Sequence, residues 1–438
     1  MLKTIAAAML MSAAFIVTAY AEGGKVTIVT SFSKDVTDPF KAGFEAGNPG
    51  FTLDVQNKST SSGVKYVDET KSNNQVDLFW ASAPDAFDNL KGRNLLTKFK
   101  PSVTGLPEKV GSYPVNDPDG FYFGFAASGY GIMSNDRYLE ANSLPKPVEW
   151  SDLVKAEYHD HIAIAAPSRS GTTHLTIETI LQGEGWDKGW GTLKGIGGNL
   201  QQVTERSFGV PDAVNSGQTG IGIVIDFFAF SAQASGFPVS FSYPSVTTVV
   251  PANIGIIANA PNQPGAEAFV NYLLSEKGQA VLLEPAIRRL PINPALYEKA
   301  PEGFPNPFKD PRFQSMITFD SDTSKKRTDV VDTLFDQLIS FQLDNLKGAT
   351  KAIHDAEKAL ASNDQPEARA LLTEAHALIA AMPVTADEAA SQQIRDAFTG
   401  GEQKTARQAE LEQQWAAFAS EKYAAAKTKA EAALALVD

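Results

Sequence analysis

Residues 121–135 read FYFGFAASGYGIMSN, and residues 237–257 read FPVSFSYPSVTTVVPANIGII. Both stretches are long, extended in character and interrupted by glycine or proline, whereas the strand patterns around them are short. A chain that forms two α/β lobes has to cross between them, and two long extended segments suit two crossings. We therefore predict that these segments connect a pair of lobes, and that lobe one is built from both ends of the α/β region.

Short β-branched runs alternate with helical patterns on either side of these segments. The expected strands are 25–30, 51–55, 76–80, 161–165 and 220–227, and the expected helices include 39–45, 173–182 and 266–283. Strands that alternate with helices predict α/β layers around a largely parallel sheet. The expected domains are lobe one over residues 22–125 and 250–328, and lobe two over residues 126–249.

The composition changes near residue 328. Residues 329–438 contain three Gly and two Pro among 110 residues and are rich in Ala, so we predict an all-helical extension. Its first helix is expected to have Thr328 or Asp329 as N-cap. The apolar face of that helix comprises Val331, Leu334, Phe335, Leu338 and Ile339. Expected breaks between helices are Gly348, Pro366, Pro383 and Gly400-Gly401. We expect this bundle to pack on lobe one.

Residues 1–21 have the pattern of a secretory signal peptide. Lys3 precedes an apolar run over 5–17, and Ala19-Tyr20-Ala21 forms a small-x-small cleavage site before Glu22. The apolar run is shorter than the roughly 20 residues of a membrane-spanning helix. The chain has no cysteine, which excludes disulfides, thiolate metal sites and an N-terminal lipid-modified cysteine. We expect a soluble, non-lipidated protein of a Gram-negative periplasm.

The net charge of the chain and the absence of known catalytic motifs exclude several classes of function. The formal net charge of −13 argues against nucleic acid or an anionic membrane as a partner. It does not exclude an anionic ligand, because local donors and helix dipoles govern a pocket. The sequence has no GxSxG, GxxxxGK[ST] or HExxH motif, and its histidines do not have the spacing of metal ligands. We expect a binding protein without catalytic residues, cofactor or metal.

Four loops rich in hydroxyl groups and glycine lie where a predicted strand ends and a helix begins. They are TSFS at 30–33, SAPD at 82–85, SRSGTT at 168–173 and SFGVPD at 207–212. Ligands of α/β sheets bind at the carboxyl ends of strands, where helix N-termini offer unpaired N–H groups. Four such loops facing one cleft would cradle an anion, although each alone also has the pattern of an ordinary helix cap.

The candidate ligand-binding residues follow from these loops: Ser31, Ser33, Ser82, Ser168, Arg169, Ser170, Gly171, Thr172, Thr173, His174, Arg206 and Ser207. Arg169 offers a planar guanidinium to a phosphate or carboxylate, and Arg206 could do the same. The alternative for each is a solvated or structurally paired arginine. His174 either reaches the ligand or caps and packs in the first turn of its helix.

Five stretches resemble the type II periplasmic binding proteins of the ferric-ion and sugar-phosphate branch, and in particular the phosphoglycerate-transport binding proteins. Residues 170–190 (SGTTHLTIETILQGEGWDKGW) and 199–236 carry the resemblance most directly. The same pattern continues in VTIVTSFSKDVTDPFKAGFEAGNPGF at 26–51, VDLFWASAPDAFDNL at 76–90 and EAFVNYLLSEKGQAVLLEPAIRRLPINP at 267–294. The similarity covers about residues 25–300.

This resemblance implies two α/β lobes that close like a clamshell on a ligand and then dock on an inner-membrane ABC permease. Ferric members carry two adjacent tyrosines where this sequence has Phe227-Phe228, so a ferric-ion site is disfavoured. The preceding Asp226 is expected either to accept hydrogen bonds from ligand hydroxyls or to serve as a capping or hinge carboxylate.

The leading hypothesis is a binding component for a small organophosphate or phosphonate that resembles phosphoglycerate. The helical extension motivates a second hypothesis, because two lobes suffice to hold a small solute. In that hypothesis the protein is a ligand-sensing subunit for a membrane histidine kinase that regulates uptake.

Overall fold

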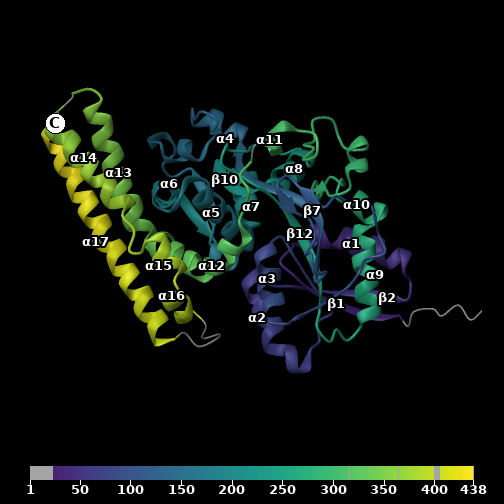
Figure 1. The fold of residues 1–438 in the computed structure, drawn as a ribbon. Helices are drawn as coiled ribbons and strands as arrows, with labels where there is room; N and C mark the ends of the chain where they lie inside the picture. Colours follow the sequence, from purple (N-terminus) through teal and green to yellow (C-terminus); the bar gives the residue numbers. More distant parts are fainter. Residues whose placement is uncertain (1–22, 315, 364, 399–404, 438) are drawn as a thin grey trace, which may run out of the picture.

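The computed structural model describes residues 23–314, 316–363, 365–398 and 405–437 (Figure 1). The predicted signal peptide and Gly400-Gly401 lie outside these residues. Figure 1 shows the helical extension on the left, lobe two in the middle and lobe one on the right. Among the described helices, none combines the length and the apolar character that a membrane crossing requires. The lobe boundaries inferred from the sequence stay a proposal, except that the whole of α12, which begins at Ser321, is grouped with the helical extension.

Lobe one contains a mixed sheet in the order β2-β1-β3-β12-β7. Its strands are β1 (Gly24–Thr30), β2 (Phe51–Asn57), β3 (Leu78–Ala81), β4 (Leu96–Thr97), β12 (Val249–Ile257) and β13 (Leu290–Pro291), beside a small hairpin of β5 (Lys109–Val110) and β6 (Tyr113–Pro114). Its main helices are α1 (Lys34–Gly47), α2 (Thr60–Thr70), α3 (Pro84–Gly92), α9 (Gln263–Leu274) and α10 (Glu276–Val281), and the short α11 (Pro311–Gln314) follows. Strand β1 pairs in parallel with β2 and β3, whereas β12 runs antiparallel to β3.

Lobe two continues the sheet in the order β7-β10-β8-β9. Its strands are β8 (Ile162–Ala165), β9 (Leu200–Thr204), β10 (Ile221–Ile225) and β11 (Val239–Ser242). Its helices are α4 (Asp136–Ala141), α5 (Gly171–Glu184), α6 (Trp186–Gly198), α7 (Gly209–Asn215) and α8 (Asp226–Ala234). Strands β10, β8 and β9 are parallel, as the alternation of strands and helices predicts.

Strand β7 (Tyr122–Asn135) serves both halves of the sheet, and all of its residues are buried. Its first part, Tyr122–Gly129, pairs with β12, and its second part, Tyr130–Ser134, pairs with β10. The second long segment begins as β11 beside the end of β7 and then enters lobe one as β12. The two segments predicted to cross between lobes therefore do so.

Two predicted elements end earlier than the sequence pattern indicated. The expected strand 220–227 stops at Ile225, because Asp226 begins α8. The expected helix 266–283 is two helices, α9 and α10, because Ser275 adopts an extended conformation and its hydroxyl caps α10 by accepting a hydrogen bond from Gly278 N.

The extension comprises α12 (Ser321–Phe335), a π-helical turn (Asp336–Ser340), α13 (Leu343–Leu360), α14 (Pro366–Ala380), α15 (Ala386–Ala390), α16 (Gln392–Ala397) and α17 (Ala406–Val437). The predicted N-cap at Thr328 or Asp329 is wrong. Helix α12 starts two turns earlier, where the Asp320 carboxylate accepts hydrogen bonds from the N–H groups of Asp322 and Thr323. The polar residues 321–329 lack the apolar period that would have marked this helix.

The other predictions for the extension have mixed outcomes. Its predicted apolar face on α12 and the following turn is confirmed, since Val331, Leu334, Phe335, Leu338 and Ile339 are all buried. The breaks at Pro366 and Pro383 are confirmed, because α14 begins at Pro366 and Pro383 lies between α14 and α15. Gly348 does not break a helix. It lies within α13, at a position where an added Cβ would meet open space.

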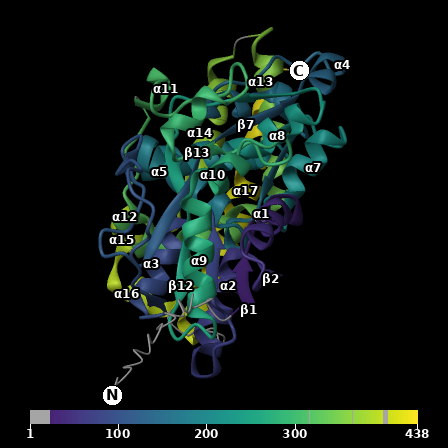
Figure 2. The same ribbon diagram turned by 90° about the vertical axis from the view of Figure 1, so that its right-hand side faces the viewer.

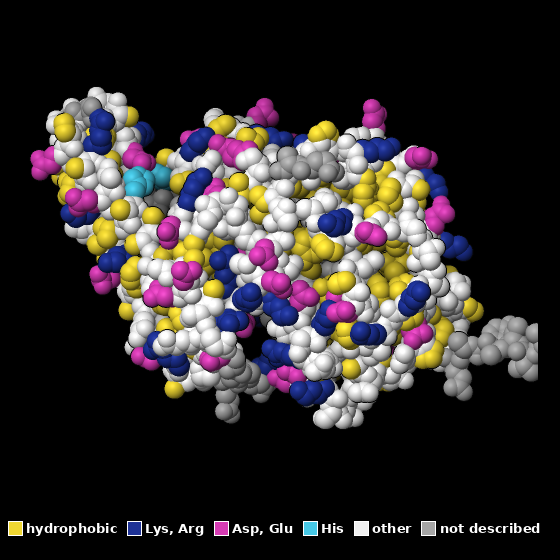
Figure 3. Space-filling view, in the orientation of Figure 1, with side chains coloured by type: hydrophobic (Ala, Val, Ile, Leu, Met, Phe, Trp, Pro, Cys, Tyr) yellow, Lys and Arg dark blue, Asp and Glu magenta, His cyan; other side chains and the backbone are white. Residues whose placement is uncertain are grey.

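The apolar core of the extension packs on lobe two, and only α12 also contacts lobe one, so the expectation that the bundle packs on lobe one is wrong. Its apolar residues share one cluster with Trp190 and Ile196 of α6, and Figure 2 places α17 behind the lobes when lobe one faces the viewer. Glycines of α6 allow this close approach, because a Cβ on Gly198 would lie 1.9 Å from Thr350 Oγ1 of α13. Figure 3 shows a small group of histidine side chains near the upper end of the boundary between the extension and lobe two.

Candidate functional site

A small cavity, the cleft cavity, lies between the lobes. It is lined by Ser31, Phe32, Ser33, Val36, Ser82, Thr172, Ser207, Phe208, Phe227 and Phe228. Its volume of about 20 Å³ is enough for roughly one water molecule, so the lobes are closed on one another. Five lining residues were predicted from sequence: Ser31, Ser33, Ser82, Thr172 and Ser207.

Each of the four predicted loops contributes to this cavity, and each does so at the end of a strand. Ser31 and Ser33 follow β1, and Ser33 is the N-cap of α1. Ser82 follows β3, Thr172 lies in the first turn of α5, and Ser207 lies between β9 and α7. The helix N-termini therefore bring N–H groups and hydroxyls to one place, which is the arrangement that favours an anion.

The hydroxyl-lined cavity has a buried cation behind it, Arg289. Its side chain is fully buried, and its Nη2 donates to Ser82 Oγ at 2.6 Å and to Ser128 Oγ at 3.0 Å. The guanidinium carbon lies 4.4 Å from the ring centre of Phe227 and 5.0 Å from that of Phe32. Because Ser82, Phe227 and Phe32 all line the cavity, the guanidinium is separated from it by a single layer of side chains.

Two nitrogens of Arg289, Nε and Nη1, have no hydrogen-bond partner among the residues that the structure describes. Burial lowers the pKa of Arg289 to about 10, against the opposing charge of Asp226, so the side chain remains cationic at neutral pH. Buried donors are nearly always paired. A buried charge without full pairing lowers the stability of the folded state by roughly several kcal/mol. A ligand oxyanion near Arg289 would offer acceptors to its unpaired donors and would also balance its buried charge.

The backbone positions Arg289 through strand pairing. Strand β13 pairs with β7, with Leu290 opposite Ala127, which brings Arg289 beside Ser128. The preceding Arg288 has a φ of 46°, a left-handed conformation that turns the chain from α10 into β13. Arg289 is not among the ligand-binding residues predicted from the sequence. The adjacent pair Arg288-Arg289 before the short segment Leu290-Pro291 was the available signal.

Asp226 lies beside the point where β7 changes its strand partner. Its Oδ2 accepts hydrogen bonds from Gly129 N and from the Tyr243 hydroxyl, both at 2.7 Å, and Gly129 is where β7 changes partner from β12 to β10. The side chain is fully buried, and burial raises its pKa to about 6 although these hydrogen bonds oppose the shift. The hydrogen bonds to β7 and Tyr243 agree with the expected hinge role, which stays a prediction, and the charge of Asp226 interacts with that of Arg289.

Most polar groups of the loop before α5 form hydrogen bonds with other groups of the protein. Ser170 Oγ accepts hydrogen bonds from Thr173 N and from the Thr173 hydroxyl, which caps the helix. The Ser168 side chain bonds to Asp336 of the extension, and its carbonyl accepts from Ser61 Oγ of lobe one. Gly171 lies so close to lobe one that a Cβ would be 2.7 Å from Ala83 Cβ.

His174 faces the extension instead of the cleft cavity. It is buried, with Nδ1 2.7 Å from Asp332 Oδ1, Nε2 3.0 Å from Ser324 Oγ and Nε2 3.6 Å from Asp85 Oδ2. Burial lowers the pKa of His174, but the charges of Asp332 and Asp85 outweigh it and raise the pKa to about 10. Lobe one, lobe two and α12 therefore meet at one protonated histidine.

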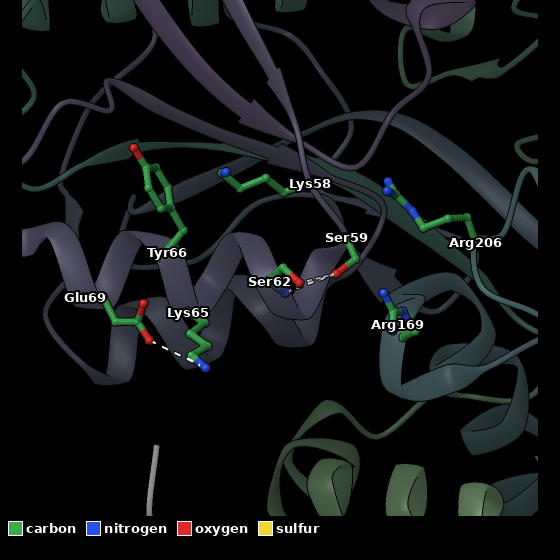
Figure 4. Close-up of a pocket in the computed structure, with 8 residues that line it drawn as sticks. All are labelled: Lys58, Ser59, Ser62, Lys65, Tyr66, Glu69, Arg169 and Arg206. Carbon is green, nitrogen blue, oxygen red and sulfur yellow. Dashed lines mark hydrogen bonds and ion pairs between the residues drawn. The ribbon is translucent and has the colours of Figure 1, made fainter. Parts of the chain in front are cut away.

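Arg169 and Arg206 lie outside the cleft cavity, in a neighbouring pocket (Figure 4). Half of the Arg169 side chain is exposed, and its nearest carboxylate is Glu205 at 3.8 Å. Arg206 Nη2 donates to Asn57 Oδ1 of lobe one at 3.0 Å, a bond between the lobes. Within the described residues, no group of three or more His, Asp or Glu side chains is arranged to hold a metal ion.

The chain is similar in sequence to a known protein family and to individual transport proteins. A family model described as bacterial extracellular solute-binding protein matches residues 73–317. The phosphoglycerate transport regulatory protein PgtC of Salmonella typhimurium is 31% identical over 353 residues, covering 80% of this chain and 85% of that protein. Iron uptake protein A1 of Synechocystis is 24% identical over 207 residues, covering 43% of this chain and 55% of that protein.

Solved structures share the fold. The periplasmic binding protein AfuA from Actinobacillus pleuropneumoniae, with fructose-6-phosphate bound, superposes with a TM-score of 0.65 at 19% identity, covering 72% of this chain and 98% of that chain. Iron-bound HitA from Pseudomonas aeruginosa superposes with a TM-score of 0.59 at 14% identity, covering 70% and 98%. The prediction of a two-lobe, type II periplasmic binding fold with a helical extension is confirmed.

Proposed function

Because the chain belongs to the family of bacterial extracellular solute-binding proteins, we propose that it captures a small organophosphate or phosphonate between its two lobes. The observation that carries this proposal is Arg289, a buried cation with two unpaired donors beside a cavity lined by serine and threonine hydroxyls. A tetrahedral oxyanion accepts hydrogen bonds from a guanidinium and from several hydroxyls together.

In this proposal the lobes open, and the anionic group of the solute enters beside Ser82. Closure then places its oxygens against the Ser82, Thr172 and Ser207 hydroxyls, and Arg289, which donates to Ser82 Oγ, supplies the countercharge behind them. The names of two similar proteins support the ligand class, since PgtC is named for phosphoglycerate transport and AfuA is described with fructose-6-phosphate. The aromatic pair Phe227-Phe228, with ring centres 4.4 Å apart, offers no phenolate oxygen to a ferric ion.

We further propose that the protein works in the periplasm and delivers its solute to an inner-membrane ABC permease. The family consists of binding proteins, and the site has the features of capture: donors, a hinge and a closing cleft. No catalytic residue and no cofactor enters the proposal.

The test is a panel of thermal-shift and calorimetric titrations at fixed salt. We expect 3-phosphoglycerate, fructose-6-phosphate or methylphosphonate to raise the unfolding temperature, as a ligand of the folded state does. Arg289→Met should weaken binding at least about a hundredfold, because charge-assisted hydrogen bonds are lost. Arg288→Met is the matched control, since that neighbouring guanidinium donates to the Leu283 carbonyl instead.

A second variant covers the case in which Arg289→Met fails to fold. Ser82→Ala removes one hydroxyl from the cleft cavity and should weaken binding about fivefold to tenfold, as expected for a single hydrogen bond. If polyamines or metal ions stabilise the protein while none of the anions does, the proposal is wrong. Unchanged affinity in a folded Arg289→Met variant would also contradict it.

A second candidate function, ligand sensing for a membrane histidine kinase, is favoured by one observation. Helix α12 contacts both lobes: Asp332 and Ser324 bond to His174 of lobe two, which faces Asp85 of lobe one, and Ser321 bonds to the Tyr113 hydroxyl of lobe one. Movement of the lobes would therefore be transmitted to the extension. The regulatory designation of PgtC supports the same idea.

Point substitutions test sensing better than truncation, because the extension shares its apolar core with lobe two. Tyr113→Phe combined with Asp85→Asn removes the Tyr113–Ser321 hydrogen bond and the charge of Asp85 beside His174, and leaves the Glu178–Arg327 pair to lobe two intact. Sensing predicts that solute binding and uptake persist while solute-dependent induction is lost. Induction at the wild-type level in this variant would exclude signalling through these contacts.

A further inference from the structure

An open pocket beside the cleft cavity, here called the outer basic pocket, has a volume of about 320 Å³. Lobe one contributes Lys58, just before α2, and Lys65 and Glu69 on α2, while lobe two contributes Arg169 and Arg206. Figure 4 shows α2 on one side of the pocket and the two arginines on the other. Four cations and one carboxylate thus line a pocket in a chain whose formal net charge is −13.

Among the described residues, Lys58 and Arg206 form no ion pair, and the ion pair of Arg169 is long and exposed. Glu69 is 3.7 Å from Lys65, and Glu205 reaches Arg169 only at 3.8 Å with 78% of its side chain exposed, where an ion pair contributes little. The ammonium of Lys58 lies 4.2 Å from the centre of the Tyr66 ring and forms no ion pair within the described residues. Burial lowers the pKa of Arg206, and the charge of Arg169 lowers it further.

The outer basic pocket forms when the lobes close, because its cations come from both lobes. The closed state is held by the Arg206–Asn57 bond and by Ser61 Oγ donating to the Ser168 carbonyl at 2.9 Å. Closure brings like charges together across the pocket, and their repulsion opposes closure until an anion lies between them.

The outer pocket adjoins the cleft cavity. The Arg206 guanidinium lies 5.1 Å from the ring centre of Phe208, which lines the cleft cavity. Arg169 lies three residues before Thr172, which also lines it. A solute with one anionic group near Arg289 could therefore extend a second group into the outer pocket.

We infer that the outer basic pocket binds a second anionic group of the solute, between Lys58 of lobe one and Arg169 and Arg206 of lobe two. The inference rests on the proposed function, which assigns the first anionic group to Arg289. The solute class is then a phosphate ester or phosphonate that also carries a carboxylate or a second phosphate. Neutralising the facing cations couples recognition of this group to closure of the lobes.

Two probes that differ in this group test the inference. Glycerol 3-phosphate has one anionic group, and 3-phosphoglycerate has the same three-carbon skeleton with a carboxylate in place of the terminal hydroxymethyl group. We expect the wild-type protein to bind 3-phosphoglycerate at least about tenfold more tightly, as expected for a hydrogen-bonded charge. Calorimetric titrations at one ionic strength keep screening constant.

The variants Lys58→Gln and Arg169→Gln should each weaken 3-phosphoglycerate binding about tenfold or more and change glycerol 3-phosphate binding less than about threefold. Lys146→Gln is the matched control, since it removes the same charge from an exposed position outside both pockets. Substitution of Arg206 is avoided as a first test because its bond to Asn57 also joins the lobes.

The outcomes separate the two proposals. If wild type binds both probes equally and neither variant alters the ratio, the second-site inference is wrong while the proposed function stands. If wild type binds neither these probes nor any other phosphate ester or phosphonate, the proposed function fails and the inference fails with it. Loss of binding to both probes in Lys58→Gln, with unfolding unchanged, would also overturn the assignment, because Lys58 would then serve the first anionic group.

Discussion

The ion pair between Glu178 of α5 and Arg327 of α12 should be essential for attaching the extension to lobe two. Arg327 Nε and Nη2 donate to the two carboxylate oxygens of Glu178 at 2.8 and 2.9 Å. The Glu178 side chain is fully buried and that of Arg327 is 9% exposed. Arg327→Met keeps most of the side-chain length but leaves the Glu178 carboxylate in the interior with Gln182 as its remaining side-chain donor.

Removing one partner of such a buried pair costs about 3 to 5 kcal/mol. At roughly 2 °C per kcal/mol for a chain of this size, the unfolding temperature should fall by about 6 to 10 °C. The double variant Glu178→Leu with Arg327→Met leaves no unpaired charge and should recover most of this loss. Thermal unfolding followed by circular dichroism measures both effects.

Arg407→Met provides the comparison for an exposed pair. Arg407 and Glu410 are 2.7 Å apart but roughly half exposed, so the variant should change stability by less than about 1 kcal/mol. The reasoning fails if Arg327→Met unfolds at the wild-type temperature. It also fails if the double variant is less stable than the single one, because the cost would then come from packing and not from an unpaired charge.

Three further predictions follow from packing and charge. Gly198→Ala should destabilise the protein by about 1 to 3 kcal/mol through overpacking, since its Cβ would collide with Thr350, whereas Gly191→Ala, whose Cβ would lie 3.7 Å from Ala380, should unfold near the wild-type temperature. The pKa of His174 is raised to about 10, so its stabilising contribution is fully present below the unfolded pKa of roughly 6.5 and is lost as the pH rises through about 10. The unfolding temperature of wild type should therefore fall more between pH 7 and pH 10 than that of His174→Gln. Parallel curves of unfolding temperature against pH would contradict this. Lys58→Gln combined with Arg169→Gln should reduce the repulsion across the outer basic pocket. The radius of gyration of the unliganded variant, measured by small-angle scattering, should therefore be no larger than that of wild type. A larger value would show that these cations do not oppose closure of the lobes.

Features encoded by local pattern were predictable from the sequence. Strand β7 is long and wholly apolar or small, and its length distinguished it from the short strands around it. The loops that contain Ser31, Ser82, Thr172 and Ser207 lie at transitions from strand to helix, and in an α/β sheet such transitions gather at one edge. The topology of the sheet therefore brings the four predicted loops together at one cleft.

Features that depend on distant partners were not predictable in this way. The burial of Arg289 follows from pairing of β13 with β7, a contact between segments far apart in sequence. His174 has the same local pattern as a ligand-binding residue, and only its contacts 150 or more residues away place it against the extension. The docking of the extension on lobe two had a local signal, the glycines of α6, but a row of glycines does not reveal which helix will approach it.

The contacts of α12 determine how the extension moves when the lobes open. Lobe two holds α12 through the buried Glu178–Arg327 pair and a large shared apolar cluster. Lobe one contacts α12 through the Tyr113–Ser321 hydrogen bond, and Asp85 of lobe one lies 3.6 Å from His174 of lobe two, which in turn bonds to Asp332 and Ser324 of α12. The attachment to lobe two buries far more apolar surface and is the stronger one. Opening should therefore separate α12 from lobe one while the extension moves with lobe two, so that the contacts at Ser321 and His174 depend on whether the cleft is closed.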